Sequence, residues 1–319
     1  MSWTETFPYL SDDLIAEFDE LSTAAERAEL EEWLGVARTY NRQAGKPHIV
    51  SMTLFWKHVN IDHPDMARPS RRRLIHSRRL GLVKRFDPYE SYVEPLLQYG
   101  PELSAAHPDV CFRVYLASDL DFLRPELVAA GFEVKVMKSD SLRYCPGGFW
   151  RFLALGDRGK LITVMDSDRI RFAAGEMART QSMADSGLAL WRVPGYYNTE
   201  VRTNVRYRPL LGGHFGAKGG VPVRKWIEVF IWHTRRGTMP NTAEVPGCGP
   251  LPINATVWPS YGFDEWWQLA IYPRLAPRGV LTFLPTDARS QLLPLDIEFT
   301  TWANPKSEIV YFRAGGGCC

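Results

Sequence analysis

The sequence predicts an α/β protein with a mixed, mainly parallel central sheet that is flanked by helices and preceded by a helical extension. Short apolar runs typical of buried strands alternate with segments of helical spacing, and this alternation favours a parallel sheet. The 319 residues are 45% hydrophobic and 23% charged, an ordinary balance for a globular protein. We expect a helical extension over residues 1–45, one main domain over residues 46–312 and a flexible tail over residues 313–319.

The first expected elements are helices followed by strands. Apolar residues recur at helical spacing between residues 11 and 43, and Thr23 with Glu26 forms a capping-box pattern for the second helical segment. Apolar and β-branched residues then predict one strand between Pro47 and Leu54 and another from Val110 to Asp119.

The middle of the chain continues this alternation. We expect a helix from Pro125 to Ala130, a strand from Phe132 to Met137, and a helix over the sequence GGFWRFLAL that leads into a strand ending at Asp166. The segment from Arg235 to Pro259 is dense in Pro and Gly. Because loops of that length are usually functional or disordered, we interpret it as a mobile flap.

Composition limits the class of protein. The net charge of +2 excludes a globally basic nucleic-acid-binding protein but leaves room for a local basic patch. Five cysteines without zinc or disulfide spacing, the lack of a long apolar run and a polar N-terminus favour a cytoplasmic protein without a transmembrane segment. The tail ends in Cys318 and Cys319, which are either a lipidation site or part of a plain disordered end.

Two carboxylates follow the strand LITVM directly. Asp166 and Asp168 lie where that strand leaves the core, and ligands of α/β sheets bind at such strand ends. Spaced two residues apart on a turn, the two carboxylates can reach one hard cation, which can also bind the two phosphates of a nucleotide diphosphate. Acidic residues at strand ends are also common in solvated turns, so the pair alone leaves both interpretations open.

Further segments accompany the acidic pair. They are VYLASD after an early strand, GGFWRFLALGDRGKLITVMDSDR, RPLLGGHFGAKGG and YGFDEWWQLAIYP. Together, in this order, they resemble nucleotide-sugar glycosyltransferases of the GT-A fold, in which a Trp-Arg-Phe helix precedes the acidic motif, a Leu-Gly-Gly turn follows it and a Tyr-x-x-Asp segment comes later. The resemblance covers roughly residues 49–273 and implies a GT-A-like sheet.

The resemblance implies a donor and metal site. Mn²⁺ or Mg²⁺ would be held by Asp166 and Asp168, of which Asp168 is the expected direct ligand. Several other residues are expected to contact the nucleotide-sugar donor, namely Thr53, Lys57, Trp150, Arg151, Asp166, Gly212 and Gly213. Two structural interpretations stay open: Arg151 as a helix arginine paired to a carboxylate, and the glycines as a tight turn.

Asp264 and Glu265 are the expected catalytic residues. They lie beside two tryptophans, and a partly apolar site would raise the pKa of a carboxylate toward that of a useful general base. The family often completes its metal shell with a late histidine, whereas the last histidine here is His233. We expect Asp287 or water in that place, with His214 as a weaker substitute.

A basic segment from Arg68 to Arg85 carries eight Lys and Arg side chains and one His. It is either a solvated helix face or a contact surface for phosphates of a nucleic-acid acceptor, a lipid or a nucleotide. The arginines expected to contact a nucleic acid are Arg71, Arg72, Arg73, Arg78 and Arg79.

The sequence therefore predicts a metal-dependent hexosyl- or pentosyltransferase that moves a sugar from a nucleotide diphosphate to the hydroxyl of a saccharide, a small molecule or a modified DNA base. Inversion and retention both stay open. The alternatives are a nucleotidyltransferase or phosphohydrolase on the same fold, or a nucleic-acid or membrane-surface binding module that uses the basic segment.

Overall fold

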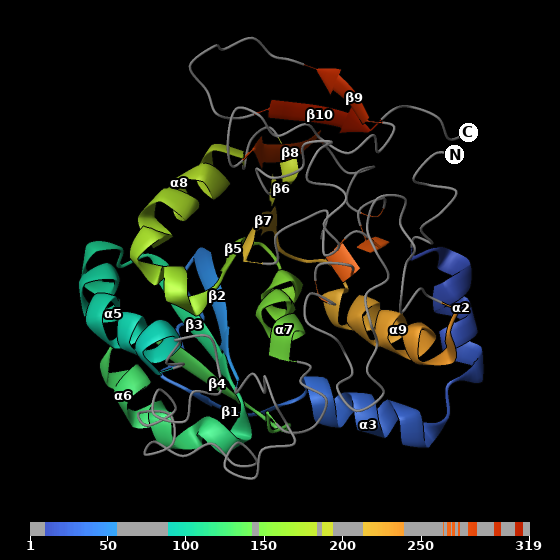
Figure 1. Cartoon of the computed structure of the whole chain (residues 1–319), viewed down its shortest axis with the longest axis horizontal. Coiled ribbons are helices and arrows are strands. Elements are labelled where there is room, and N and C mark those ends of the chain that lie inside the picture. The colour runs from blue at the N-terminus through green and yellow to red at the C-terminus, as the bar shows by residue number, and fades with distance from the viewer. Residues whose placement is uncertain are drawn as a thin grey trace, which may run out of the picture.

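A ten-stranded sheet organises the protein, with the strand order β1-β4-β3-β2-β5-β7-β6-β8-β10-β9 (Figure 1). The computed structural model describes residues 10–55, 89–141, 147–183, 187–193, 213–238, 280–285, 297–300 and 310–314, together with Asp264, Trp267, Gln268, Ala270, Ile271 and Arg274. The strands are β1 (Val36–Tyr40), β2 (His48–Leu54), β3 (Val110–Leu116), β4 (Glu133–Met137), β5 (Leu161–Met165), β6 (Gly187–Val193), β7 (His214–Lys218), β8 (Val280–Pro285), β9 (Ile297–Thr300) and β10 (Val310–Ala314).

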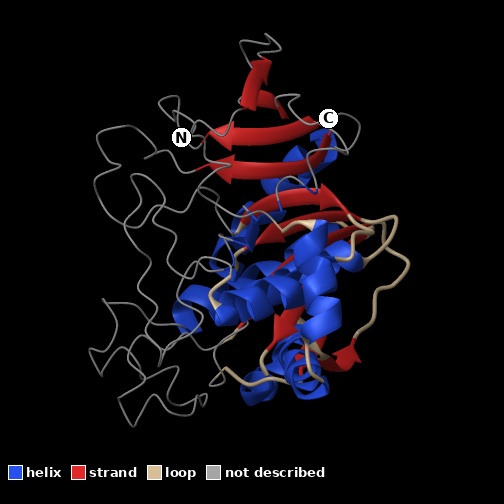
Figure 2. Cartoon of the chain, turned by 90° about the vertical axis from the view of Figure 1, so that its right-hand side faces the viewer, coloured by secondary structure: helices blue, strands red, loops and turns tan. Residues whose placement is uncertain are grey.

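The α/β fold and the mixed character of the sheet are as expected, but the expectation of a mainly parallel sheet is wrong. Four neighbouring pairs are parallel, β4-β3, β3-β2, β2-β5 and β6-β8, and the other five are antiparallel. Figure 2 shows the strands one above another along the molecule. The four strands β4, β3, β2 and β5 form a continuous parallel block, which is where the sequence shows its strand–helix alternation. All seven residues of β3 are buried, as its apolar sequence predicts.

Helices cover both faces of this block (Figure 1). One face carries α5 (Glu94–Ala106), α6 (Arg124–Ala129) and α8 (Ala173–Met183), and the other carries α7 (Gly147–Trp150) and α9 (Val223–Arg236). Short helical turns complete the connections. They are η3 (Tyr89–Val93), η4 (Ser118–Leu123), η5 (Arg151–Gly156) and η6 (Ser167–Phe172).

The N-terminal extension is helical in part. Helices α2 (Asp12–Leu21) and α3 (Ala24–Leu34) form as expected, and Thr23 and Glu26 make the predicted capping box at the start of α3. Residues 36–40 differ from the expectation, because they form strand β1 and pair antiparallel with β4 at the edge of the sheet. The extension therefore contributes a strand to the main sheet.

The extension also packs against α9. The ring of Phe18 meets that of Trp232 edge to face, with the centroids 5.6 Å apart. Arg235 of α9 pairs with Glu29 at 2.6 Å. Arg235 and Arg236, which were expected to begin the flap, belong instead to α9, whose C-cap residue Gly237 has the left-handed conformation. Residues 239–259 of the expected flap lie outside the described residues.

Candidate functional site

The candidate site lies at the carboxyl ends of β2 and β5. These strands are parallel neighbours, with Ser51 opposite Val164. From β2 the chain adds β3 and then β4 on one side of the sheet, and it returns to place β5 on the other side. Such a reversal of strand order is a topological switch point, where open α/β sheets bind ligands beyond the carboxyl ends of the strands. Thr53 and Asp166, each two residues further along, lie at this point.

The acidic pair forms the first part of the site. Asp166 directly follows β5 and is the N-cap residue of η6, with an extended backbone conformation (φ −78°, ψ 144°). Ser167 is buried, which anchors the turn between the two carboxylates, and Asp168 in the first turn of η6 is exposed. The side chain of Asp166 keeps 41% of its surface exposed. Both carboxylates are therefore accessible from the same turn.

Arg151 joins this pair to a distant part of the chain. Its side chain is only 8% exposed, and its Nη1 pairs with Asp166 Oδ1. Its Nη2 lies 2.5 Å from Oδ2 of Asp264, whose side chain is 12% exposed. The backbone of Arg151 is fixed as well, because the hydroxyl of Ser51 donates a hydrogen bond of 2.6 Å to its carbonyl oxygen. Residues from β2, η5, the end of β5 and the segment around residue 264 thus meet at one guanidinium.

The two carboxylates hold Arg151 in its charged form. Burial alone would lower the pKa of the guanidinium, but the negative charges of Asp166 and Asp264 outweigh that effect and raise the pKa above its ordinary value. Within the described part of the chain, the buried Nε of Arg151 has no hydrogen-bond partner. The arginine therefore acts as a fixed cation between two carboxylates.

Two glycines make room for these carboxylates. A Cβ atom on Gly213, which immediately precedes β7, would lie 2.1 Å from Oδ2 of Asp166. A Cβ on Gly148 of α7 would lie 3.2 Å from Cγ of Asp264. The close neighbour of Gly213 is therefore the Asp166 side chain, whereas the expected donor contact of Gly213 stays a prediction and Gly212 lies outside the described residues. Nothing in the sequence indicated that Gly148 makes room for Asp264, although Gly148 belongs to the Gly-Gly pair that precedes the Trp-Arg-Phe motif.

The other residues that were expected to contact the donor do not join Arg151 and its carboxylates in the described part of the chain. Thr53 is partly buried near the end of β2, and its hydroxyl donates to the carbonyl of Tyr115 at 3.3 Å. Trp150 has no exposed surface, and its indole N–H donates to the carbonyl of Trp33 at 2.8 Å. This buried position makes Trp150 a core residue and not a surface of the site, contrary to the expected donor contact. Lys57 lies outside the described residues.

Asp264 takes part in the site, although in a different way from the expected one. Its carboxylate pairs with Arg151 and is only 12% exposed, so it is engaged in an ion pair at the position where the sequence predicts a base. Nearby Trp267 is fully buried, with its ring 4.9 Å from that of Phe152. Glu265 lies outside the described residues.

His233 does not belong to the candidate site. His233 is buried in α9, where Nε2 lies 2.8 Å from the carbonyl of Leu14 and Nδ1 lies 2.7 Å from the hydroxyl of Thr238. Both ring nitrogens are therefore engaged in structural contacts. Among the residues that the structure describes, no group of three or more His, Cys, Asp or Glu side chains is arranged to hold a metal. Asp287 and the side chain of His214 are not described.

The remaining expected features lie elsewhere. The basic segment with Arg71, Arg72, Arg73, Arg78 and Arg79 falls in residues 56–88, outside the described residues, as does the tail with Cys318 and Cys319. None of the described helices has the length and apolar character needed to cross a membrane. A comparison of the sequence with protein-family models and with curated proteins finds no match.

Proposed function

We propose that this protein is a metal-dependent glycosyltransferase that moves a sugar from a nucleotide diphosphate to an acceptor hydroxyl. The observation that carries the proposal is the contact of Arg151 with both Asp166 and Asp264, at the switch point beside β2. The glycosyltransferase resemblance assigned all three residues, and Gly213, to one site although they are distant in sequence. Their meeting at one place supports the resemblance and the GT-A-like fold it implies.

The carboxylates are suited to a hard cation. Mg²⁺ is commonly held by one or two carboxylates, with waters and substrate phosphates as the remaining ligands, so a third protein ligand is not required. The exposed carboxylate of Asp168 and the exposed part of Asp166 match that arrangement. A bound Mn²⁺ or Mg²⁺ would stabilise the negative charge of the leaving diphosphate.

Arg151 serves as a positioning residue in this proposal. Both of its terminal nitrogens are bound to carboxylates, and its side chain is too buried to present a broad surface to a donor. By binding one oxygen of Asp166, it fixes the direction of the other oxygen. Preorganisation of this kind lowers the cost of orienting a ligand at the moment of reaction.

The general base of an inverting reaction is assigned to Glu265. Asp264 is bound to Arg151 and is 12% exposed, so its carboxylate maintains the position of the arginine. Glu265 is then the remaining sequence-predicted carboxylate in this segment. A retaining reaction would need no such base, and the stereochemistry of the product distinguishes the two cases.

The test is a product analysis with sugar nucleotides. The full-length protein is incubated with nucleoside-diphosphate sugars and Mn²⁺, and the products are identified by mass spectrometry. Release of an intact nucleoside diphosphate that requires the cation supports sugar transfer or donor hydrolysis. The test is repeated with Asp168→Asn, which removes the carboxylate assigned to the cation. Asp109→Asn is its matched control, because Asp109 is an exposed aspartate in the turn before β3, away from the site.

Two outcomes would contradict the proposal. Cleavage between the phosphates, or transfer of a nucleotide, would assign the same site to a nucleotidyltransferase or phosphohydrolase. No turnover combined with no thermal stabilisation by any sugar nucleotide in the presence of Mn²⁺ would remove the donor site altogether, since a ligand of the folded state raises stability.

A further inference from the structure

A polar cavity lies at the opposite end of the parallel block, at the amino ends of its strands. It has a volume of about 440 Å³ and lies where the amino ends of β2 and β4 meet the turn before β5. Ile49 at its wall and Leu54 at the other end of β2 are five residues apart, or roughly 17 Å along a strand. Six basic side chains line the cavity: Arg42, Lys46, Arg113, Lys135, Arg158 and Lys160.

The cavity carries an excess of positive charge. Its two acidic residues, Glu133 and Asp157, are both bound to Arg113, at 2.6 Å and 2.5 Å. Four positive charges remain unbalanced by the lining, on a protein whose net charge is only +2. Burial and the nearby charge of Arg113 lower the pKa of the Lys135 ammonium. An anion in the cavity would relieve that repulsion.

The rim of the cavity is held rigidly. The side chain of Asn41 donates to the carbonyl of Phe132 at 3.1 Å, which ties the turn after β1 to the start of β4. The ammonium groups of Lys46 and Lys160 donate to backbone carbonyls at 3.0 Å each, the first to Val110 and the second to Ala44. Each ammonium has three N–H groups and uses one of them in these contacts, so two N–H groups on each lysine can donate to a ligand. A preorganised rim of donors reduces the entropy lost on binding.

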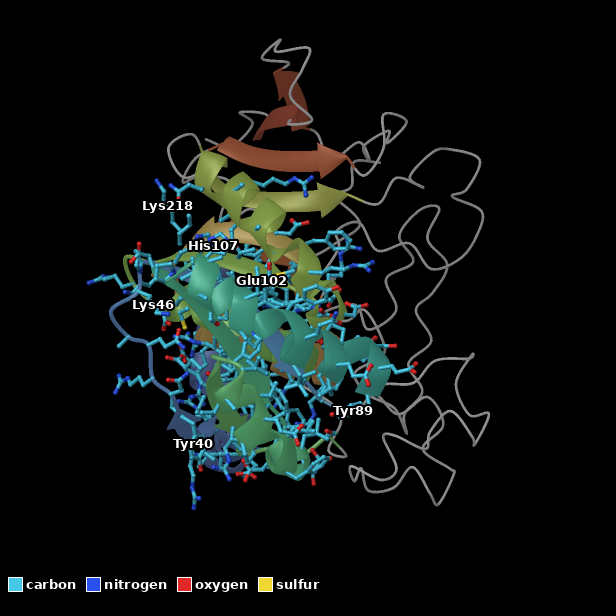
Figure 3. The ribbon with its side chains drawn as sticks, turned by 90° about the vertical axis from the view of Figure 1, so that its left-hand side faces the viewer. Tyr40, Lys46, Tyr89, Glu102, His107 and Lys218 are labelled. Carbon is cyan, nitrogen blue, oxygen red and sulfur yellow. The ribbon has the colours of Figure 1, made fainter. Side chains whose placement is uncertain are left out.

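In Figure 3, Lys46 lies toward one margin of the molecule and Tyr89 toward the other. Lys46 precedes the amino end of β2, whereas Tyr89 begins η3, which packs against the turn η6 that carries Asp168. The basic cavity and the carboxylate site are therefore at different ends of the same strands. A ligand in the cavity would not occupy the donor site.

We propose that this cavity binds a small anion carrying at least two phosphate groups, at a site separate from the one assigned to the sugar donor. Phosphates match the lining because each brings up to two negative charges and three acceptor oxygens, and arginine and lysine are the side chains that recognise them. The volume of the cavity is sufficient for a diphosphate, and its fixed rim favours a compact ligand over a flexible chain.

The test is a calorimetric titration of the full-length protein with pyrophosphate. A chelator removes divalent cations, so that metal-dependent binding at Asp166 and Asp168 cannot contribute. We expect one saturable site. Replacing the two exposed arginines together, as Arg42→Gln with Arg158→Gln, should weaken binding about tenfold or more, because charge-assisted contacts are lost.

Two control variants show whether the binding depends on the basic cavity. Arg38→Gln removes one positive charge next to Thr39, which lines the cavity, but alternate residues of a strand point to opposite faces, so it controls for each single substitution Arg42→Gln and Arg158→Gln. It should change the affinity by less than about twofold. Asp168→Asn should leave pyrophosphate binding unchanged, so failure of the donor-site proposal would not affect this result.

Three outcomes would overturn the inference. The first is the absence of saturable pyrophosphate binding. The second is a loss of affinity in Arg38→Gln that equals the loss in the variant with Arg42→Gln and Arg158→Gln. The third is binding of a DNA duplex that depends on Arg42 and Arg158 while pyrophosphate does not bind. The last would assign the surface to a nucleic-acid backbone. Circular dichroism of every variant establishes that the fold is retained.

Discussion

Two buried arginines, one toward each end of the parallel block, are built alike. Arg151 and Arg113 have side chains that are 8% and 6% exposed, and each bridges two carboxylates. In both cases the arginine is fully charged, and burial of its charge is compensated by two opposite charges. Each arginine and its two carboxylates thus form an ion triad, and both triads compensate the cost of burying a positive charge.

The surroundings of the two triads differ. Asp168 adds a further exposed carboxylate two residues after Asp166, and Gly213, which has no Cβ, leaves room for the Asp166 carboxylate. Beside Arg113, the additional charges are the lysines and arginines of the basic cavity. The comparison teaches that the triad itself does not determine which ligand an edge binds. In our proposals the neighbouring charges decide it, with a cation at the carboxyl end and an anion at the amino end.

The largest expected effect concerns the carboxyl end. Asp168→Asn removes the exposed carboxylate that we assign to the cation and should lower turnover of a sugar nucleotide about 1,000-fold or more, as loss of a metal ligand does. Because the side chain is exposed, the midpoint of thermal unfolding should match that of Asp109→Asn. Near-native turnover of Asp168→Asn in chelator would remove the metal from the proposal.

The next largest effect compares the two arginines directly. Arg113→Met and Arg151→Met each leave two carboxylates without their cation, and breaking a buried pair in this way costs about 3–5 kcal/mol. The loss should be larger for Arg113→Met, because Glu133 is 1% exposed whereas Asp166 is 41% exposed and can be hydrated. Denaturant titration of both variants measures the difference. A larger loss in Arg151→Met would show that the carboxyl-end triad carries more of the stability.

These features were predictable from sequence to different degrees. The strands of the parallel block were predictable because each is a short apolar run, and Asp166 was predictable because it directly follows one. The role of Arg151 was visible only as two alternatives, since no sequence pattern says which carboxylates will surround an arginine. Glu133 and Lys135 belong to β4 and Asp157 belongs to the turn before β5, so only the register of β3 with β4 and the position of that turn bring them together around Arg113.

A third prediction concerns pH and the amino end of β2. Burial, with a contribution from the charge of His107, lowers the pKa of His48 from 6.5 to about 4. The hydroxyl of Thr163 donates to Thr180, so it accepts from Nε2 of His48, which places a proton on Nε2. Between pH 6.5 and 4 the unfolded chain therefore binds a proton that the folded protein does not.

The free energy of unfolding should consequently fall as the pH falls through that window. The contribution of His48 is fully present above pH 6.5 and amounts to about 3 kcal/mol at most. His48→Gln should flatten the pH dependence, and His107→Gln should flatten it less, because burial is the larger cause of the lowered pKa of His48. Denaturant titrations at several pH values measure the slopes. Equal slopes in the native protein and His48→Gln would mean that His48 is charged in the folded state.

The fourth prediction separates the adjacent residues Asp264 and Glu265. Glu265→Gln should lower turnover about 100-fold with little change in donor affinity, as loss of a general base does. Asp264→Asn should instead lower the stability of the protein, because it weakens the ion pair with Arg151. Kinetics and denaturant titration of both variants distinguish the two roles. Unchanged turnover in Glu265→Gln would favour a retaining reaction.

The smallest expected effect concerns the room that Gly213 leaves for the carboxylate of Asp166, at the carboxyl end of β5. Gly213→Ala would place a Cβ 2.1 Å from Asp166 Oδ2, and Asp166 cannot simply turn away because Arg151 holds its other oxygen. We expect a loss of about 1–3 kcal/mol of stability, as overpacking costs, together with reduced turnover because the acidic pair is displaced.

Gly175→Ala is the matched control for this substitution. Gly175 lies in α8 with nothing within 4 Å of its missing Cβ, so alanine should stabilise the helix by about 0.5–1 kcal/mol. The two identical substitutions should therefore shift the denaturation midpoint in opposite directions. If Gly213→Ala instead leaves stability and turnover at native values, the close approach of Asp166 to this backbone is not required, and the geometry assigned to the acidic pair is wrong.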